Sequence, residues 1–323
     1  MRHRKLLILI IFLVAVAAVA GVVYYRMARP GRAVLLLPDG DVVIYADLAP
    51  IPFVNVGQFI DVDQLPGQSD PEYRDFITQT NFHVERDLKT IAISIRNPSE
   101  ANPELAAVFT GKFDLDGLRT YMQGHSTGSE SYAGKTIFSV RGADHLVRAC
   151  LVDSSTVAVT NTDSADSIHS IIDKATHSYR SGEAPPLVRD YYNYVPFGSL
   201  GWAMLRVPAQ NSQFTGGMKM DFLQNAVAVI SVRYTGSVRI RADVISANQA
   251  DAAKVLEAFN QFLAFGRAAA ESLGSGPDKD VKAVFDRIQV EQKGNETIVN
   301  VVIPQEVVKK VGQKMSQAGP RSD

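Results

Sequence analysis

An uncharged run of 20 residues, Leu6 to Tyr25, restricts what this chain can fold into more than any other feature of the sequence. At about 1.5 Å of rise per residue, a helix of this length spans the hydrocarbon layer of a bilayer, which is about 30 Å thick. Tyr24 and Tyr25 at the end of the run are residues typical of the membrane interface. The sequence therefore predicts one transmembrane helix over 6–25 that contacts the lipid bilayer and is retained as a signal anchor.

A cleavable secretory signal is the alternative interpretation of this run. Three basic residues precede it, and Ala18-Val19-Ala20 before Gly21 fits a cleavage site, so the remainder would then be secreted. Basic residues are equally frequent on both sides of the run. A segment at the start of a chain usually leaves its short tail in the cytoplasm while the long remainder is translocated. We therefore expect the body of the protein to lie outside the cytoplasm, with the opposite orientation as the alternative.

Charge and cysteine content exclude several further classes. Residues 33–323 carry a net charge of −7, which is a poor match for phosphate backbones, so we expect no nucleic acid partner. The single cysteine, Cys150, allows neither an intramolecular disulfide nor a cysteine-based zinc cluster. The six histidines lie singly and not at metal-ligand spacing. We predict no metal, no cofactor and no catalytic residue.

The pattern after the first segment predicts an α+β protein. Strand pairs and amphipathic helices alternate, and a strand followed by a helix recurs four times, which indicates an internal duplication. The four helices are expected to start at Asp114, Asp163, Asn248 and Pro304, and the side chains of Asp163 and Asn248 can cap free backbone amides. We expect antiparallel sheets with helices packed on one face. The predicted organisation is a cytoplasmic tail (1–5), the transmembrane helix (6–25), a linker (26–32), a first α+β half (33–182), a second α+β half (183–316) and a disordered tail (317–323).

The strand pair around Thr235-Gly236-Ser237 supplies the candidate binding residues. Its apolar residues share one face only if these three residues form the loop. This register places Arg233 opposite Arg239, and Ser231 opposite Arg241, so three guanidinium groups crowd one face. We interpret them as a possible contact for an anion or a partner; the alternative is neutralisation by Asp243 or Glu291 on a neighbouring strand.

Two other motifs point to specific chemistry. Gly124-His125-Ser126-Thr127-Gly128 matches the G-x-S-x-G motif of serine hydrolases, with Ser126 as nucleophile, but that motif needs a strand before the serine and a helix after it. Here a helix is predicted before and a strand after. Acidic residues between Asp61 and Glu72 faintly suggest a calcium loop, but Leu65 and Pro66 occupy positions where an EF-hand needs a ligand and a glycine.

Four short stretches resemble a pattern found in uncharacterised bacterial proteins of acidobacterial type. They are Tyr45-Ala46-Asp47-Leu48, Tyr73-Arg74-Asp75-Phe76, Asn81-Phe82-His83-Val84-Glu85-Arg86-Asp87-Leu88 and Thr110-Gly111-Lys112-Phe113-Asp114, and the similarity covers mainly residues 34–142. The resemblance implies a single-pass envelope protein of the bacterial inner membrane with a large exported body and no assigned activity.

The leading hypothesis from these observations is a membrane-tethered binding or scaffolding module outside the cytoplasm, without catalytic activity, that contacts an envelope protein. The first alternative is a serine hydrolase that uses Ser126. The second is a carrier of an apolar envelope ligand, because Phe259, Phe262 and Phe265 recur at helical spacing and could line a pocket.

Overall fold

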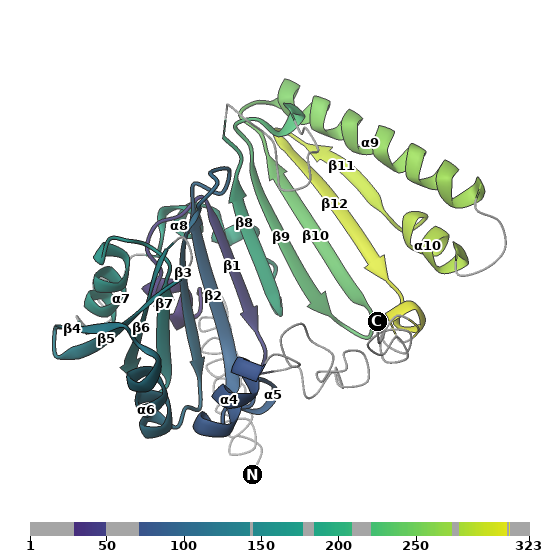
Figure 1. The fold of residues 1–323 in the computed structure, drawn as a ribbon. Helices are drawn as coiled ribbons and strands as arrows, with labels where there is room; N and C mark the ends of the chain where they lie inside the picture. The colour runs from purple at the N-terminus through teal and green to yellow at the C-terminus, as the bar shows by residue number, and fades with distance from the viewer. Residues whose placement is uncertain are drawn as a thin grey trace, which may run out of the picture.

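A single antiparallel sheet of twelve strands dominates the structure (Figure 1). The computed structural model describes residues 29–49, 71–142, 145–176, 184–208, 221–272, 278–308 and 310. The strand order is β11-β12-β10-β9-β8-β1-β2-β3-β7-β6-β5-β4. The strands are β1 (Val42–Asp47), β2 (Leu88–Arg96), β3 (Glu104–Gly111), β4 (Gly128–Tyr132), β5 (Lys135–Arg141), β6 (Leu146–Asp153), β7 (Thr156–Thr160), β8 (Gly201–Arg206), β9 (Val227–Tyr234), β10 (Val238–Ile245), β11 (Gln289–Lys293) and β12 (Glu296–Ile303).

Helices are few and mostly short by comparison. They are α2 (Arg32–Leu36), α4 (Pro71–Thr80), α5 (Val84–Asp87), α6 (Leu115–His125), α7 (Asp166–Thr176), α8 (Pro186–Tyr191), α9 (Gln249–Ser272) and α10 (Asp278–Phe285), with the 3-10 turns η3 (Tyr192–Tyr194) and η4 (Asp221–Leu223). Within the described ranges, none of these helices is both long enough and apolar enough to cross a membrane. The segment Leu6–Tyr25, for which the sequence predicts a transmembrane helix, lies outside the described residues.

The expected fold class, an α+β protein with several antiparallel sheets and helices packed on one face, is wrong, because one antiparallel sheet of twelve strands dominates the structure. Strand β1 pairs with β8, from Val42 opposite Leu205 to Ala46 opposite Gly201, and this pairing joins the two parts of the chain into one sheet. The predicted boundary at residue 182 lies outside the described residues. Local periodicity identifies strands, but it carries no information about which distant strands pair, and so it could not separate one sheet from two.

The two parts follow a similar path through this sheet. Strands β1, β2 and β3 form a meander that leads into α6, and a later strand, β7, pairs with β3. Strands β8, β9 and β10 form a second meander that leads into α9, and a later strand, β12, pairs with β10. The pairing of β1 with β8 lies between these two similar arrangements.

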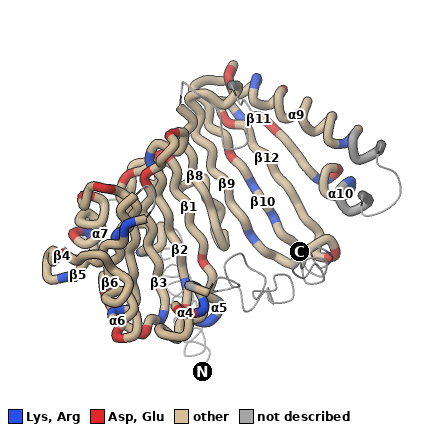
Figure 2. The backbone as a smooth tube through the Cα atoms, viewed as in Figure 1, with Lys and Arg blue, Asp and Glu red and all other residues tan. Residues whose placement is uncertain are grey.

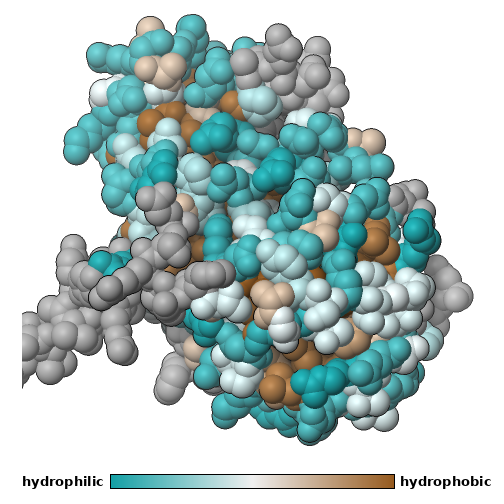
Figure 3. Space-filling view, turned by 90° about the vertical axis from the view of Figure 1, so that its left-hand side faces the viewer, coloured by the Kyte–Doolittle hydropathy of each residue, from teal (hydrophilic) through white to brown (hydrophobic). Residues whose placement is uncertain are grey.

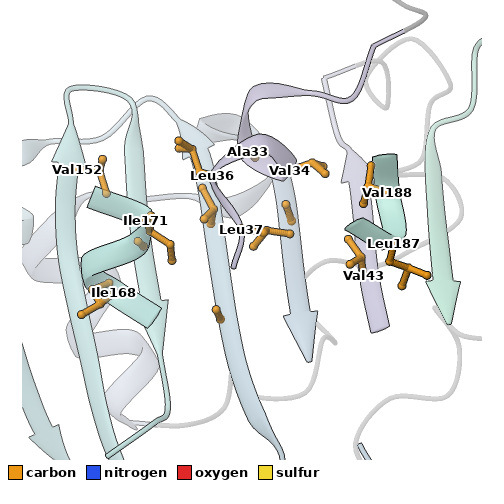
Figure 4. Close-up of a cluster of buried hydrophobic side chains, with 14 of the residues drawn as sticks. Ala33, Val34, Leu36, Leu37, Val43, Val152, Ile168, Ile171, Leu187 and Val188 are labelled. Atoms are coloured by element: carbon orange, nitrogen blue, oxygen red, sulfur yellow. The ribbon is translucent and has the colours of Figure 1, made fainter. Parts of the chain in front are cut away.

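One face of the sheet, called the covered face below, carries the main core. Val43, Met204 and Val229 point to this face, and they are fully buried. Helices α2, α7 and α8 pack over it (Figure 4). The core side chains from these helices, together with Leu37 directly after α2, are Ala33, Val34, Leu36, Ile168, Ile171, Ile172, Leu187 and Val188. The prediction that helices cover one face only is also wrong, because α9 packs on the other side.

Helix α9 packs on the opposite face, at the β11 end of the sheet. Val255 of α9 forms a second cluster with Ala228 and Val244, which alternate along their strands with residues of the covered face. This cluster lies over β9 and β10, and α9 continues over β12 and β11 (Figure 1). The Thr297 hydroxyl donates to the Ala252 carbonyl oxygen at 3.0 Å and fixes the start of the helix on the sheet.

Local capping follows the sequence in two of the predicted helices and not in a third. Asp114 accepts from the Asp116 and Gly117 amides at 3.2 and 3.1 Å and caps α6. Asn248 accepts from the Asp251 amide at 2.9 Å and caps α9. The predicted cap at Asp163 is wrong. The Arg148 guanidinium binds the Thr162, Asp163 and Ser164 carbonyls and holds this loop outside the helix, which begins at Asp166.

Both edge strands of the sheet are polar. β4 has the sequence GSESY and is exposed over four of its five residues, while β11 has the sequence QVEQK. Seen from the β4 side, the surface is mostly hydrophilic and its apolar groups form small patches (Figure 3). Polar edges discourage pairing with a further strand.

Candidate functional site

The central strands present an apolar surface on the face opposite the covered face. Two neighbouring cross-strand rows contain only apolar residues and glycine, and we call them the apolar strip. The first row is Ile93, Ile44, Ala203, Ile230 and Ala242, and the second is Ile91, Ala46, Gly201, Val232, Ile240 and Val301. At about 4.8 Å between strands, the six strands of the second row span about 24 Å.

Solvent reaches every residue of the apolar strip. Ile44 is 38% and Ile230 is 40% exposed, and the others are partly exposed. An antiparallel sheet that faces water normally alternates apolar inward residues with polar outward ones. In β1 and β2 the residues between these rows on the covered face, Tyr45 and Ala92, belong to the core, so these strands carry apolar residues on both faces. The strip therefore has the composition of a surface that becomes covered.

The phenylalanine stripe of α9 is divided between core and surface. Phe259 packs against the second cluster and meets the Phe222 ring edge-on, with ring centroids 6.2 Å apart. Phe262 is 56% and Phe265 is 75% exposed. At Gly266, a Cβ atom would lie 2.4 Å from the Phe285 ring, so α10 approaches α9 closely there. The three phenylalanines therefore do not line one pocket together.

The arginine hairpin has the register that the sequence predicts. Arg233 lies opposite Arg239, and Ser231 opposite Arg241, with a three-residue loop in which Gly236 has a positive φ of 81°. All three arginines lie on the covered face, on the same side as Asp243. Figure 2 shows these basic positions grouped on β9 and β10.

Arg241 differs from the other two arginines because acidic residues already bind it. Its Nε lies 2.9 and 2.8 Å from the two carboxylate oxygens of Asp243, which is fully buried. Its Nη2 lies 3.5 Å from Glu296 on the neighbouring strand. The alternative that Asp243 neutralises this arginine is thus correct for Arg241 and not for Arg233 or Arg239, which form no ion pair with a described residue.

Burial beside Asp243 raises the pKa of Glu296 to about 7, because both desolvation and the neighbouring carboxylate disfavour its charged form. Arg241 and Lys293 oppose this shift, and Tyr194 also lies near both acids. Folded Glu296 therefore keeps its proton up to about pH 7, whereas the unfolded chain releases it near 4.5. Between these values unfolding releases a proton, so the free energy of unfolding falls as the pH rises.

We expect Glu296→Gln to remove this pH dependence. Relative to wild type, the variant should gain about 1 to 2 kcal/mol between pH 4.5 and pH 8. Urea unfolding at several pH values measures the difference, and Glu104→Gln, at an exposed acid paired with Arg96, is the matched control. If the free energies of unfolding of wild type and Glu296→Gln differ by the same amount at every pH, the pKa of Glu296 is not raised.

A second polar cluster, which sequence reasoning missed, lies between β4 and α7. The rings of Tyr132 and His169 stack with centroids 3.7 Å apart, and the Tyr132 hydroxyl donates to Asp173 at 2.9 Å. Glu130 lies 3.6 Å from His169 and 3.8 Å from Arg148. These groups come from three separate elements, so no local motif could reveal them. They anchor α7 to the edge of the sheet, and the cluster contains no serine, threonine or cysteine to act as a nucleophile.

Ser126 follows α6 directly and precedes β4, in the order helix–serine–strand. Its hydroxyl donates to the Gln123 carbonyl at 3.4 Å, and no hydrogen bond joins it to a histidine of the described chain. His125 instead contacts the Tyr121 carbonyl oxygen at 2.8 Å and lies 3.6 Å from Asp75. This is the geometry of a helix end, since a nucleophile elbow requires the reverse order.

The other sequence candidates give no site in the described residues. Burial raises the pKa of the Cys150 thiol to about 11, so it is unreactive at neutral pH. Among the residues that the structure describes, no group of three or more histidine, cysteine or acidic side chains could hold a metal. The acidic loop from Asp61 to Asp70 lies outside them.

Two polar clefts lie at the end of the sheet where β2 ends and β3 begins. The larger, about 400 Å³, contains Arg96, Glu104 and His145, and the smaller, about 300 Å³, contains Arg96, Asp41 and Arg206. Arg96 forms an ion pair with Glu104 at 3.3 Å inside this region. The larger cleft is also lined by Thr162, Ser164 and Ser167, but among the described residues no hydrogen bond joins one of these hydroxyls to His145.

The fold thus defines a long antiparallel sheet with one covered face and an accessible apolar strip on the other. No protein-family model and no curated protein matches the sequence. Among solved structures, crystal form I of TP0453 is 10% identical, with a TM-score of 0.45 over 89% of this chain and 99% of that one. Crystal form IV of TP0453 is 8% identical, with a TM-score of 0.47 over 89% and 97%. These likenesses assign neither a family nor a function to the chain.

Several predictions from the sequence are tested neither by the fold nor by these comparisons. The resemblance to envelope proteins of acidobacterial type, the envelope protein partner, the lack of enzymatic activity and the location outside the cytoplasm stay predictions.

Proposed function

We propose that this protein is a non-catalytic binding module that holds an apolar, chain-like ligand on the apolar strip. The observation that carries the proposal is the accessibility of two adjacent apolar rows that run across β2, β1, β8, β9, β10 and β12. Removing apolar surface from water contributes roughly 25 cal/mol per Å², so exposed surface of this kind favours an apolar occupant.

The shape of the strip favours an elongated ligand. It is about 24 Å long across the strands and two rows wide, and it contains no charged or hydrogen-bonding side chain. A ligand with many polar groups would lose hydrogen bonds to water without replacing them. A hydrocarbon chain lying across the strands loses none, so an acyl chain is the ligand class that fits this surface.

The test compares single charge substitutions on the same face of the sheet. We expect Ile44→Glu and Ile230→Glu each to lower the affinity for a fluorescent fatty acid by at least tenfold, because a carboxylate next to the hydrocarbon would be desolvated. Val140→Glu is the matched control, since Val140 is 41% exposed and lies on β5, away from the strip. Fluorescence titration measures the three affinities.

Three outcomes decide the proposal. Loss of binding in Ile44→Glu and Ile230→Glu with retention in Val140→Glu supports it. Equal affinities in all variants, or no binding of a fatty acid by the wild type, would show that the strip is not a hydrocarbon site. Labelling of Ser126 by a fluorophosphonate probe that disappears in Ser126→Ala would instead establish the hydrolase alternative.

A further inference from the structure

Arg233 and Arg239 form a pair of like charges on the covered face, away from the apolar strip. They lie directly opposite each other on β9 and β10. Residues directly opposite in an antiparallel pair have Cβ atoms about 5 Å apart, where like charges are destabilising. Arg239 is exposed and Arg233 is partly exposed, so water and solutes reach both guanidinium groups.

No acidic residue lies directly opposite either arginine in the described part of this cross-strand row. The row continues to Val302 on β12 and, on the other side, to Leu200, whose amide donates to the Val232 carbonyl. The Leu200 carbonyl accepts the Asp47 amide, so the acid Asp47 lies two strands away from Arg233. Two other acids on this face, Asp243 and Glu296, bind Arg241. Neither Arg233 nor Arg239 has an ion pair with a described residue. Two guanidinium groups therefore lie directly opposite each other, and no acid of the described ranges forms an ion pair with either.

We propose that Arg233 and Arg239 together bind a phosphate monoester. Two guanidinium groups present planar forks of N–H donors, which suit the oxygens of a phosphate group. A phosphate monoester carries a charge of about −1.5 to −2 at neutral pH, which balances the two arginines. A carboxylate would balance only one of them. This site is independent of the proposed acyl-chain site, because the two lie on opposite faces of the sheet.

The experiment uses the full-length protein and phenyl phosphate as a soluble probe. We expect calorimetric titration at constant ionic strength to show binding at least tenfold tighter than that of benzoate. Arg233→Gln and Arg239→Gln should each reduce the affinity at least tenfold, while Arg119→Gln, at an exposed arginine paired with Asp116, leaves it unchanged. Arg239→Lys keeps the charge but loses the fork, so it should bind more weakly than wild type.

A second arm identifies the source of the phosphate group. Flotation with vesicles of phosphatidylcholine containing phosphatidic acid compares wild type with Arg233→Gln and Arg239→Gln. The proposal is supported if phenyl phosphate or the phosphatidic acid vesicles bind in a way that depends on both arginines. The probe that binds more tightly shows whether the phosphate belongs to a soluble molecule or to a lipid.

The proposal would be overturned if neither probe shows binding that depends on the two arginines. It would also be overturned if Arg119→Gln loses as much affinity as Arg233→Gln and Arg239→Gln, because this would indicate general charge attraction. Misfolding is not expected from the glutamine variants, because they relieve repulsion between exposed groups. Circular dichroism and the melting temperature verify this.

Discussion

Ile171→Ala is expected to lower the free energy of unfolding by about 2 to 5 kcal/mol, the largest single effect that we predict. Ile171 is fully buried in the main core, where α7 packs on the covered face next to α2 (Figure 4). Truncation removes three carbon atoms and leaves a cavity that neighbouring side chains, already closely packed, fill only in part.

Urea unfolding followed by circular dichroism measures this loss. Val140→Ala is the control, because Val140 is 41% exposed and its truncation should change the stability by less than about 1 kcal/mol. If Ile171→Ala lowers the free energy of unfolding no more than Val140→Ala does, α7 does not contribute to the core in the way the structure shows.

Gly111→Ala is expected to destabilise the protein by about 2 to 3 kcal/mol, for a different reason. A Cβ atom at residue 111 would lie 2.2 Å from the Asp87 carbonyl oxygen, so the backbone would have to move. That carbonyl accepts the Lys112 amide at 2.8 Å, and the Asp87 carboxylate is itself held by Arg86 and the His83 amide. These hydrogen bonds hold the Asp87 backbone where β2 pairs with β3, and they therefore oppose the backbone movement that a Cβ atom at residue 111 would require.

Thermal unfolding of Gly111→Ala and Gly124→Ala tests this contact. Gly124 lies in α6 with no atom within 4 Å of its added Cβ, so its replacement should raise the stability by up to about 1 kcal/mol through helix propensity. Equal melting temperatures for the two variants would mean that the close approach at Gly111 is absent.

Elements formed by neighbouring residues could be predicted from the sequence. The register of the β9–β10 hairpin follows from alternation and from the three-residue loop around Gly236. The two-residue turn at Gly294-Asn295 joins β11 to β12 as its composition predicts. The caps of α6 and α9 are correct because a cap depends on a side chain and an amide only two or three residues apart.

Contacts between distant elements could not be predicted in this way. The Asp163 cap is wrong because Arg148, on another strand, binds the loop carbonyls. For the candidate sites, the sequence placed Arg233 opposite Arg239, but it could not show that, of the three arginines, Asp243 and Glu296 contact Arg241. The apolar strip was missed because its residues come from six strands, and an apolar residue in a strand reads as core until its cover is known.

The sequence by itself determined the register of the β9–β10 hairpin, the turn between β11 and β12 and the starts of α6 and α9, since each depends on interactions between residues close along the chain. Only the tertiary structure decided that β1 pairs with β8, that helices occupy both faces and that the central strands keep an accessible apolar surface. The reason is that backbone hydrogen bonds between strands are nearly the same for every residue type. Which distant strands pair is therefore set by the packing of the whole sheet and not by any local pattern.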